Sequence, residues 1–530
     1  MTGIKRQRRL FLYIKPEMED ESIPELVKRI AELPILTRNG KYFLEAGILL
    51  CLAIAIVNSI APSSNAIYFL LIIPAILLLM LFGFIIIKIL QRPELGIPVI
   101  ALMLPFERIG ALSSSSFNVR LSQVFTVIAF IAYIFYTAYT DKKNKFGGIK
   151  IKRDTSFLLL IIFAIINIAS LAIAVNKGRS LYVLIFDLFI FFVYIFVSNL
   201  LVSKDILKKT VWIILGISFV LCLYGIFQFG AGELHLPESI SGLLPGYSIG
   251  SFAFPRIQAT ETEPQFWGNF LIIPVCLSLS LIFSTIHINP TRKKDRINKR
   301  LIFTSMLVFI LGIINILLTF SRGTWFAIIG SIFIITVINF RRIFTPQLLV
   351  GIVVLATFAI VGFSTVLTYT KSSLDVTSLL TRAQAVTDTD RTLTTVDALS
   401  FFSAHEILGI GVGSFGPYEA ANIYQEPQAY GENIGWRIVN NEYIEILTET
   451  GLLGIFTFAL FILYLGMESI IALRKITDTY TRAILIGLIA AFVGMLIQYW
   501  AFSTLYVMDI WFLFAILNAV AFNINTNLWT

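Results

Sequence analysis

A basic turn between two long apolar runs is the first place in the chain where chemistry is expected. Ser321-Arg322-Gly323 separates Leu301–Phe320 from Thr324–Phe340, and each run is long enough, or nearly so, to cross a bilayer. Arg322 therefore belongs at a membrane face. Its planar guanidinium stays charged near lipid and donates two parallel hydrogen bonds, which suits phosphate. The alternative is a snorkelling arginine with Gly323 supplying backbone freedom.

Three glutamates share one face of a second predicted helix. Glu442, Glu445 and Glu449 are spaced i, i+3 and i+7 in IVNNEYIEILTETGLLG. A helix from Asn441 to residue 472 would be about 48 Å long, more than the roughly 30 Å apolar core of a bilayer, so we expect its first turns to stand outside. Glu442 is then a candidate general base beside a phosphate. Alternatively, Asn441 caps the helix, Glu442 complements its dipole, and Glu449 bonds to a neighbouring helix.

Two further segments carry candidate catalytic side chains. RIQATETEPQFWG places Arg256 and Glu263 just before a helix that Pro264 can start, so this loop offers either a second site or a simple salt bridge. His405, in AHEILGIGVGSF, is a candidate proton shuttle or phosphate partner, or else a hydrogen-bonded loop histidine.

One acid lies inside an apolar run. Asp187, in LYVLIFDLFIFFVYIF, is a functional candidate because ionisable groups within a membrane are costly, although pairing with Arg179 is equally plausible. No group of side chains has metal-ligand spacing, so we predict neither a metal nor a cofactor.

The composition shows why these residues are interpreted against a membrane. The chain has 530 residues, of which 57% are hydrophobic and 14% charged, whereas soluble domains carry about 25% charge. Successive apolar runs of about 20 residues predict an all-α polytopic membrane protein, because a barrel would show short alternating segments. The net charge of +9 is concentrated in short loops and does not indicate nucleic-acid binding.

Basic loops set the expected topology. Lysine and arginine collect at 141–153, 203–209, 291–300, 341–342 and 474–482, and placing all of these in the cytoplasm lets every span alternate with both termini inside. The predicted outer segments are 110–120, 176–180, 231–265, 321–323, 369–441 and 503–508. We expect 12–14 spans, because the third candidate span is short. The candidates are 44–60, 67–90, 97–109, 121–139, 156–175, 181–202, 210–230, 266–287, 300–320, 324–340, 347–368, 450–472, 482–502 and 509–525.

This topology divides the chain into four parts. Residues 1–43 form a cytoplasmic arm, and 44–368 form a transmembrane bundle with an outer loop at 231–265. Residues 369–441 form one large extracytoplasmic loop, and 442–530 carry the C-terminal transmembrane helices. Charged groups thus collect at the outer boundary. A transporter would instead place polar groups near the midplane and have short outer loops.

Four segments together resemble a known family. LTFSRGTW, DRTLTTVDALSFFSAHEILGIGVGSF, NNEYIEILTETGLLG and RIQATETEPQF resemble, in order and spacing, the O-antigen ligase and O-antigen polymerase superfamily of bacterial envelope enzymes. The resemblance covers about 256–472. It implies a fold similar to the all-helical GT-C glycosyltransferases. It also implies donors that are undecaprenyl-diphosphate-linked glycans on the outer face of the bacterial inner (plasma) membrane.

The resemblance also implies roles for individual residues. Arg322 and Arg256 match arginines that hold the diphosphate, and Arg391 of the loop run is a third candidate. Ligases usually carry a histidine-asparagine pair where this chain has Asn440 and Asn441, and asparagine cannot act as a general base.

The departure at residues 440 and 441 favours a polymerase of surface polysaccharide, with Glu442 or Glu263 as the base. A chain-length regulator is a possible partner of such a polymerase. A ligase that transfers the glycan to a lipid or protein, and a flippase for lipid-linked oligosaccharides, are the alternatives.

Overall fold

The computed structural model describes residues 82–108, 112–114, 117–140, 154–247, 254–285, 299–340, 387–424 and 437–529. The chain divides into two compact units, 1–93 with 131–149, and 94–130 with 150–530. The described part of the first unit comprises a helix over Phe82–Gln91 and the C-terminal half of α6 (Leu121–Thr140). The second unit carries the remaining elements, and the account below concerns it alone. The predicted spans 44–60 and 347–368, and most of 67–90, lie outside the described residues.

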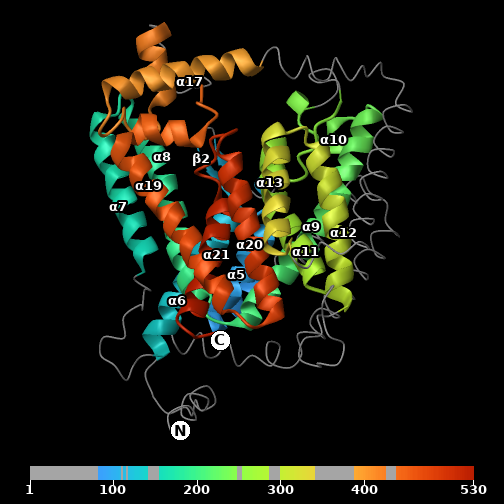
Figure 1. The fold of residues 1–530 in the computed structure, drawn as a ribbon. Coiled ribbons are helices and arrows are strands. Elements are labelled where there is room, and N and C mark those ends of the chain that lie inside the picture. Colours follow the sequence, from blue (N-terminus) through green and yellow to red (C-terminus); the bar gives the residue numbers. More distant parts are fainter. Residues whose placement is uncertain are drawn as a thin grey trace, which may run out of the picture. The chain divides into compact units, whose positions relative to one another are not determined.

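Apolar helices make up most of the second unit (Figure 1). Their bounds are α5 (Gly96–Met103), α7 (Thr155–Ser170), α8 (Lys177–Leu200), α9 (Lys204–Glu233), α11 (Pro264–Thr285), α12 (Lys299–Leu318), α13 (Arg322–Ile338), α19 (Glu442–Lys475), α20 (Thr479–Gln498) and α21 (Met508–Asn525). Among the described helices, eight are long and apolar enough to cross a membrane. The predicted all-α polytopic membrane class is therefore confirmed. With eight residues, α5 is too short to cross a bilayer by itself, in line with the short third span predicted from the sequence.

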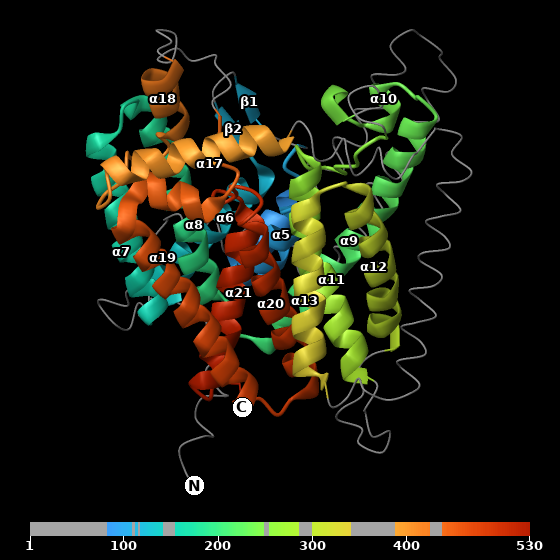
Figure 2. The same ribbon diagram turned by 45° about the horizontal axis from the view of Figure 1, so that its top comes forward.

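Shorter elements lie between these helices. They are the antiparallel hairpin β1 (Leu112–Ser114) and β2 (Phe117–Val119), α10 (Glu238–Ser241), α17 (Thr387–Ala404), α18 (Phe415–Glu419), the 3-10 turns η2 (Pro93–Leu95), η3 (Leu171–Ile173) and η4 (Pro245–Tyr247), and the π turn η6 (Ala420–Tyr424). In both ribbon views α17 lies across the helix ends (Figure 2), and it packs on α19.

The core of the second unit lies along α11, α20 and α21. In the most apolar stretch of each of these helices, 89%, 72% and 89% of the residues are buried, respectively. Large side chains such as Trp267, Phe270 and Trp511 are fully buried there. By contrast, only 28% of the residues in the most apolar stretch of the helix over Thr155–Ile173, which includes α7, are buried, although the mean hydropathy of that stretch is 2.7. An exposed apolar face of this size is expected where lipid covers a helix.

The described parts of the predicted outer segments are joined at one end of the second unit. The N–H of Ile257 donates to the carbonyl of Leu318 at 3.3 Å, which joins the loop before α11 to the end of α12. The N–H of Glu442 donates to the carbonyl of Tyr499 at 2.8 Å, which joins the start of α19 to the end of α20. These bonds place the end of α12 beside the loop before α11, and the end of α20 beside the start of α19.

The turn around Arg322 differs from the prediction in its register. Because α12 ends at Leu318 and α13 begins at Arg322, the chain reverses over Thr319–Ser321, with Phe320 in the left-handed region at φ 50°. Arg322 and Gly323 are already helical. A Cβ on Gly323 would lie 2.5 Å from the Cβ of Ala501, so this glycine allows close helix packing and is not needed for backbone freedom.

The long helix after Asn441 is not straight. Gly451 has φ 67° and ψ −166°, and it separates a first segment, Glu442–Thr450, from Leu452–Lys475. A conformation of this kind is essentially restricted to glycine. The prediction of one continuous helix from Asn441 to residue 472 is therefore wrong, because the chain turns at Gly451.

Candidate active site

The loop before α11 is fixed by one buried glutamine. The side-chain oxygen of Gln228 on α9 accepts from the N–H of Ala259 at 2.8 Å, and its amide donates to the carbonyl of Ala259 at 3.0 Å. Within this loop, the Nε of Arg256 donates to the carbonyl of Thr319 at 3.0 Å, and the guanidinium lies 5.9 Å from the ring centre of Tyr247. The loop therefore holds Arg256 against the turn that precedes α13.

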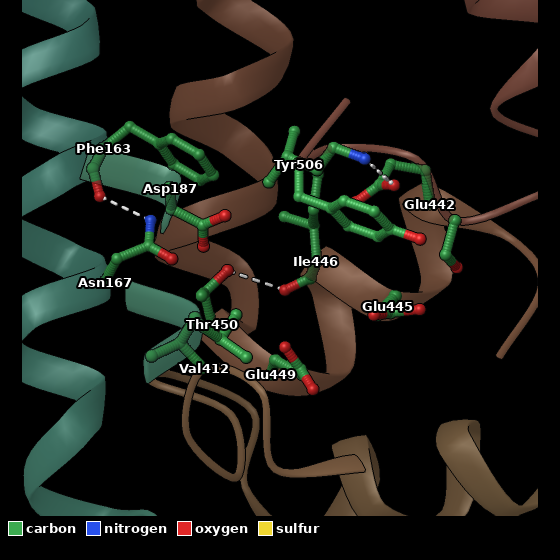
Figure 3. A pocket seen from close by; sticks show the side chains of 13 residues that line it. Phe163, Asn167, Asp187, Val412, Glu442, Glu445, Ile446, Glu449, Thr450 and Tyr506 are labelled. Atoms are coloured by element: carbon green, nitrogen blue, oxygen red, sulfur yellow. Dashed lines mark hydrogen bonds between the residues drawn. The ribbon is translucent and has the colours of Figure 1, made fainter. Parts of the chain in front are cut away.

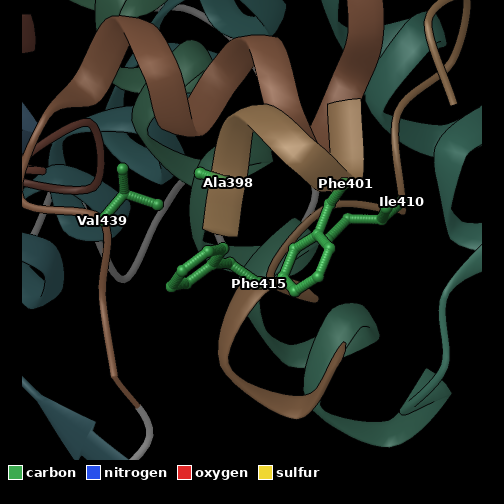
Figure 4. Packing of buried hydrophobic residues seen from close by; sticks show 5 residues of the cluster. All are labelled: Ala398, Phe401, Ile410, Phe415 and Val439. Carbon is green, nitrogen blue, oxygen red and sulfur yellow. The ribbon is translucent and has the colours of Figure 1, made fainter. Parts of the chain in front are cut away.

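A small apolar cluster positions the segment that carries Arg391. Ala398 and Phe401 of α17 pack with three buried residues from the following turn and from the segment just before α19, as Figure 4 shows: Ile410, Phe415 and Val439. On the same helix, Nη1 of Arg391 donates to the carbonyl of Ala501 at 3.3 Å. The described part of the large predicted loop is thus packed onto the start of α19.

Arg256 and Arg391 bond backbone carbonyls next to the start of α13, the helix that Arg322 begins. Arg256 is bonded to Thr319, three residues before Arg322, and Arg391 is bonded to Ala501, which packs against Gly323. Three residues span at most about 10 Å of chain. We call Arg256, Arg322 and Arg391 the arginine cluster.

The electrostatics of the arginine cluster suit an anion. Burial lowers the pKa of Arg256, and the positive charge of Arg391 acts in the same direction, while Tyr247 and Glu263 oppose both effects. A bound anion would relieve the repulsion between these two guanidinium groups. The first N–H groups of α13 add a partial positive charge at the same place. This combination is typical of a phosphate site.

Glu263 lies beside the arginine cluster, as the sequence predicted. Burial raises the pKa of its carboxyl group, and the charge of Arg256 opposes that rise. The carbonyl of Glu263 also accepts from the N–H of Phe266 at 3.1 Å at the start of α11. This carboxylate is therefore held close to a positive charge, where it could accept a proton or balance Arg256.

A second group of predicted residues surrounds a pocket between α7, α8, α19 and the segment that joins α20 to α21. The pocket has a volume of about 50 Å³. Figure 3 shows carboxyl groups from α8 and from the first segment of α19 around it. We call it the carboxylate pocket, and its lining includes Asp187, Glu442, Glu445, Glu449, Ser503 and Tyr506. The predicted shared face of the three glutamates is thus confirmed. Asp187, for which pairing with Arg179 was one interpretation, lines the same pocket as these glutamates.

Glu442 holds the segment between α20 and α21. Its Oε2 accepts from the N–H groups of Thr504 and Leu505 at 2.6 and 2.7 Å. Its own N–H donates to Tyr499. Two N–H donors stabilise the charged carboxylate and occupy lone pairs that a general base would use. The geometry therefore gives Glu442 a positioning role.

Glu449 holds the glycine-rich turn, residues 409–416. Its two carboxylate oxygens accept from the N–H groups of Gly413 and Phe415, at 2.7 and 3.0 Å. The sequence analysis offered a bond from Glu449 to a neighbouring helix, whereas the structure shows a bond to this turn. We expect Glu449→Gln to destabilise the protein by about 1–3 kcal/mol, because the amide NH₂ would face a buried N–H donor. Thermal unfolding of the purified protein in detergent measures this effect, and an unchanged midpoint would contradict it.

The remaining predicted site residues lie elsewhere. Asn441 caps α19, since its side-chain oxygen accepts from the N–H of Ile444 at 3.2 Å, as one interpretation expected. Asn440 has φ 56° and donates to the carbonyl of Ile438. His405 is exposed at the end of α17, with its ring 5.7 Å from that of Tyr418. The structure does not bring these three side chains to the carboxylate pocket as it is described.

Two features of the site were not selected as candidates from the sequence. Glu445 was placed on the shared face but was not named as a site residue. The segment 499–507 was placed outside only from residue 503 and had no predicted role. Glu445 could have been selected from its i+3 spacing to Glu442. The sequence YWAFSTLYV gave no signal for this role, because the contacts of the segment are made mostly by backbone atoms.

One comparison with known proteins bears on this site. Residues 307–459 match the family described as O-antigen ligase. No curated protein matches the chain. The matched segment runs from α12 into α19 and carries Arg322, Arg391, the glycine-rich turn and the glutamates of the carboxylate pocket. It supports glycan transfer of the O-antigen ligase and polymerase type by a membrane-embedded enzyme. Over this segment the chain is similar to the O-antigen ligase family.

Proposed function

We propose that the protein transfers a glycan from an undecaprenyl-diphosphate carrier at the outer face of the bacterial inner membrane, with both of its termini in the cytoplasm. In this proposal the transfer polymerises repeat units of a surface polysaccharide. The observation that supports the proposal is that Arg256 and Arg391 bond backbone carbonyls beside the start of α13, which Arg322 begins. Such a cluster is suited to a diphosphate whose lipid tail lies among the apolar helices.

The arginine cluster would act mainly as the glycosidic bond breaks. Negative charge then builds up on the leaving diphosphate, and guanidinium groups already in place stabilise it more in the transition state than before it. The described part of the large loop packs over the start of α19. In that position it would keep water from the donor, because water competes with the acceptor hydroxyl.

Asn440 and Asn441 support polymerisation over ligation. They stand where ligases of the resembled family usually carry a histidine and an asparagine. Asn441 instead caps α19, and neither side chain can accept a proton as a base. Transfer to a lipid or protein acceptor is the second candidate, because the family match covers ligases.

Incubation of the purified protein with its lipid-diphosphate-linked repeat unit tests this proposal. The repeat unit can be extracted from a strain that lacks the gene, where it should accumulate. Electrophoresis of the products is expected to show a ladder of chain lengths. A single transfer product would support ligation, and an unchanged substrate would contradict glycan transfer and favour transport.

A further inference from the structure

The turn before α13 contains a residue whose backbone does not suit its side chain. Phe320 has φ 50°, in the left-handed region, where a bulky side chain is rarely found. Its N–H donates to the carbonyl of Leu317 at 3.1 Å, so the conformation belongs to a closed turn. Glycine or asparagine would adopt it with less strain. Strained residues persist only where their surroundings hold them, and they are frequent at functional sites.

The ring of Phe320 is held by a stacked contact with the loop before α11. Its centre lies 4.5 Å from the ring centre of Phe254, and the two ring planes differ by 22°. Trp325, in the first turn of α13, lies 6.4 Å from Phe320 by the same measure. The indole N–H of Trp325 donates to the carbonyl of Ile316 at 2.9 Å, which fixes this ring on α12. Aromatic rings thus connect the loop before α11 to the start of α13.

Two hydrogen bonds join the same loop to the same turn. The Nε of Arg256 donates to the carbonyl of Thr319 at 3.0 Å, and the N–H of Ile257 donates to the carbonyl of Leu318 at 3.3 Å. The two stacked rings lie within two residues of the Arg256 bond, one on each side of the junction. Without the ring contact, two hydrogen bonds alone would set the direction in which Arg256 extends from the loop.

Stability does not explain why residue 320 is a phenylalanine. An aromatic pair contributes about as much free energy as a left-handed backbone costs at a residue other than glycine. Phe320 is also only partly buried, so its ring adds little to the core. The effect of the ring is therefore mainly geometric. It fixes where Arg256 lies relative to the start of α13, the helix that Arg322 begins.

The charges near Arg256 show why its position needs to be held. The positive charge of Arg391 acts against that of Arg256, although Tyr247 and Glu263 oppose this effect. A contact between uncharged rings does not depend on these charges, so it can hold the loop with or without a bound anion. Ordering a flexible side chain costs conformational entropy on binding. A guanidinium that is already in place therefore binds an anion more tightly.

We propose that Phe254 and Phe320, which we call the phenylalanine pair, are positioning residues of the diphosphate site and raise its affinity for the lipid-linked diphosphate by acting through Arg256. This inference rests on the proposed function. Neither ring contacts the phosphates. The pair holds the loop against the turn, and the loop holds the guanidinium.

The test measures the equilibrium binding of undecaprenyl diphosphate to the purified full-length protein by native mass spectrometry. Phe254→Leu keeps an apolar side chain but removes the ring, so it is expected to weaken binding about 3- to 10-fold. Phe254→Tyr keeps the ring and should bind within about twofold of the unaltered protein. When Arg256→Ala is already present, Phe254→Leu is expected to have no further effect, because changes that act through one group do not add.

Phe320→Asn separates a positioning role from a contribution to the fold. Asparagine tolerates the left-handed region, so this change relieves the strain while it removes the ring. Binding is expected to weaken as much as in Phe254→Leu, while the midpoint of thermal unfolding stays within about 3 °C. A ring that served only the fold would lower the midpoint and leave binding unchanged. Phe192→Leu is the matched control, because it removes a ring from the stacked Phe192–Phe196 pair within α8 and should not alter binding.

Several results would overturn the inference, and they can be told apart from failure of the proposed function. Normal lipid binding by Phe254→Leu or by Phe320→Asn would overturn it. Equal weakening by Phe254→Leu with and without Arg256→Ala would do the same, and if Phe320→Asn does not accumulate, the Phe254 variants decide alone. Weak binding by Arg256→Ala with normal binding by Phe254→Leu would remove the inference and leave the proposed function standing. No lipid binding by the unaltered protein would remove both.

Discussion

Replacing Arg322 by alanine is expected to abolish polymer formation while the amount of protein in the membrane stays unchanged. Arg322 is the first residue of α13, where the first N–H groups of the helix add a partial positive charge. Loss of one charge-assisted contact costs about 1.5–3 kcal/mol, and removal of one donor to a developing oxyanion typically lowers a rate about 10²–10³-fold. Chain-length ladders from cells that carry the variant, together with its level in the membrane, measure the effect.

Two further variants show whether charge or geometry matters at residue 322. Arg322→Lys keeps the charge but loses the planar fork, so it is expected to retain a reduced activity. Arg300→Ala, an arginine at the opposite end of the α12–α13 pair, should leave the ladders unchanged. Normal ladders in Arg322→Ala would count directly against a diphosphate site at this turn.

Replacing Gly451 by alanine is expected to prevent stable folding. The backbone at Gly451 has φ 67° and ψ −166°, and a Cβ there would lie 2.3 Å from the carbonyl oxygen of Ile407. The strain and the clash together should cost about 3 kcal/mol or more. The glycine-rich turn and the residues just before it are bonded to α19 on both sides of Gly451, through Ile410 to Thr448 and through Glu406 to Leu452. Its attachment would be lost as well.

The level of Gly451→Ala in the membrane and its thermal unfolding in detergent test this expectation. Gly466→Ala is the matched control within α19, because the nearest atom to a Cβ there is 3.8 Å away. That change should be neutral or slightly stabilising, since alanine favours helix over glycine. Equal stability of the two variants would contradict the kinked geometry at Gly451.

Parts of the site could be predicted because they follow from local spacing and charge. The apolar runs on either side of residue 322 determine where a turn must lie, so Arg322 was identified as a residue at a helix end. Spacing along the helix placed Glu442, Glu445 and Glu449 on one face. The carboxylate pocket bears this out.

Other parts could not be predicted because they depend on contacts between distant residues. The sequence does not show that the carboxylate of Glu442 accepts hydrogen bonds from the N–H groups of residues 504 and 505. It also does not show that the carboxylate of Glu449 accepts hydrogen bonds from the glycine-rich turn. Gly451 looked like a helical residue between two apolar stretches. Its kink follows from the packing of Ile407, which lies more than forty residues earlier.

The most direct test of the account is the equilibrium binding of undecaprenyl diphosphate to the purified protein, measured by native mass spectrometry. The unaltered protein is expected to bind the lipid, and Arg322→Ala and Arg256→Ala are each expected to weaken binding by roughly 10-fold or more, as loss of a charged hydrogen bond implies. Arg300→Ala should bind as the unaltered protein does. Equal affinity of the unaltered protein, Arg322→Ala and Arg256→Ala would contradict the assignment of the arginine cluster as the diphosphate site.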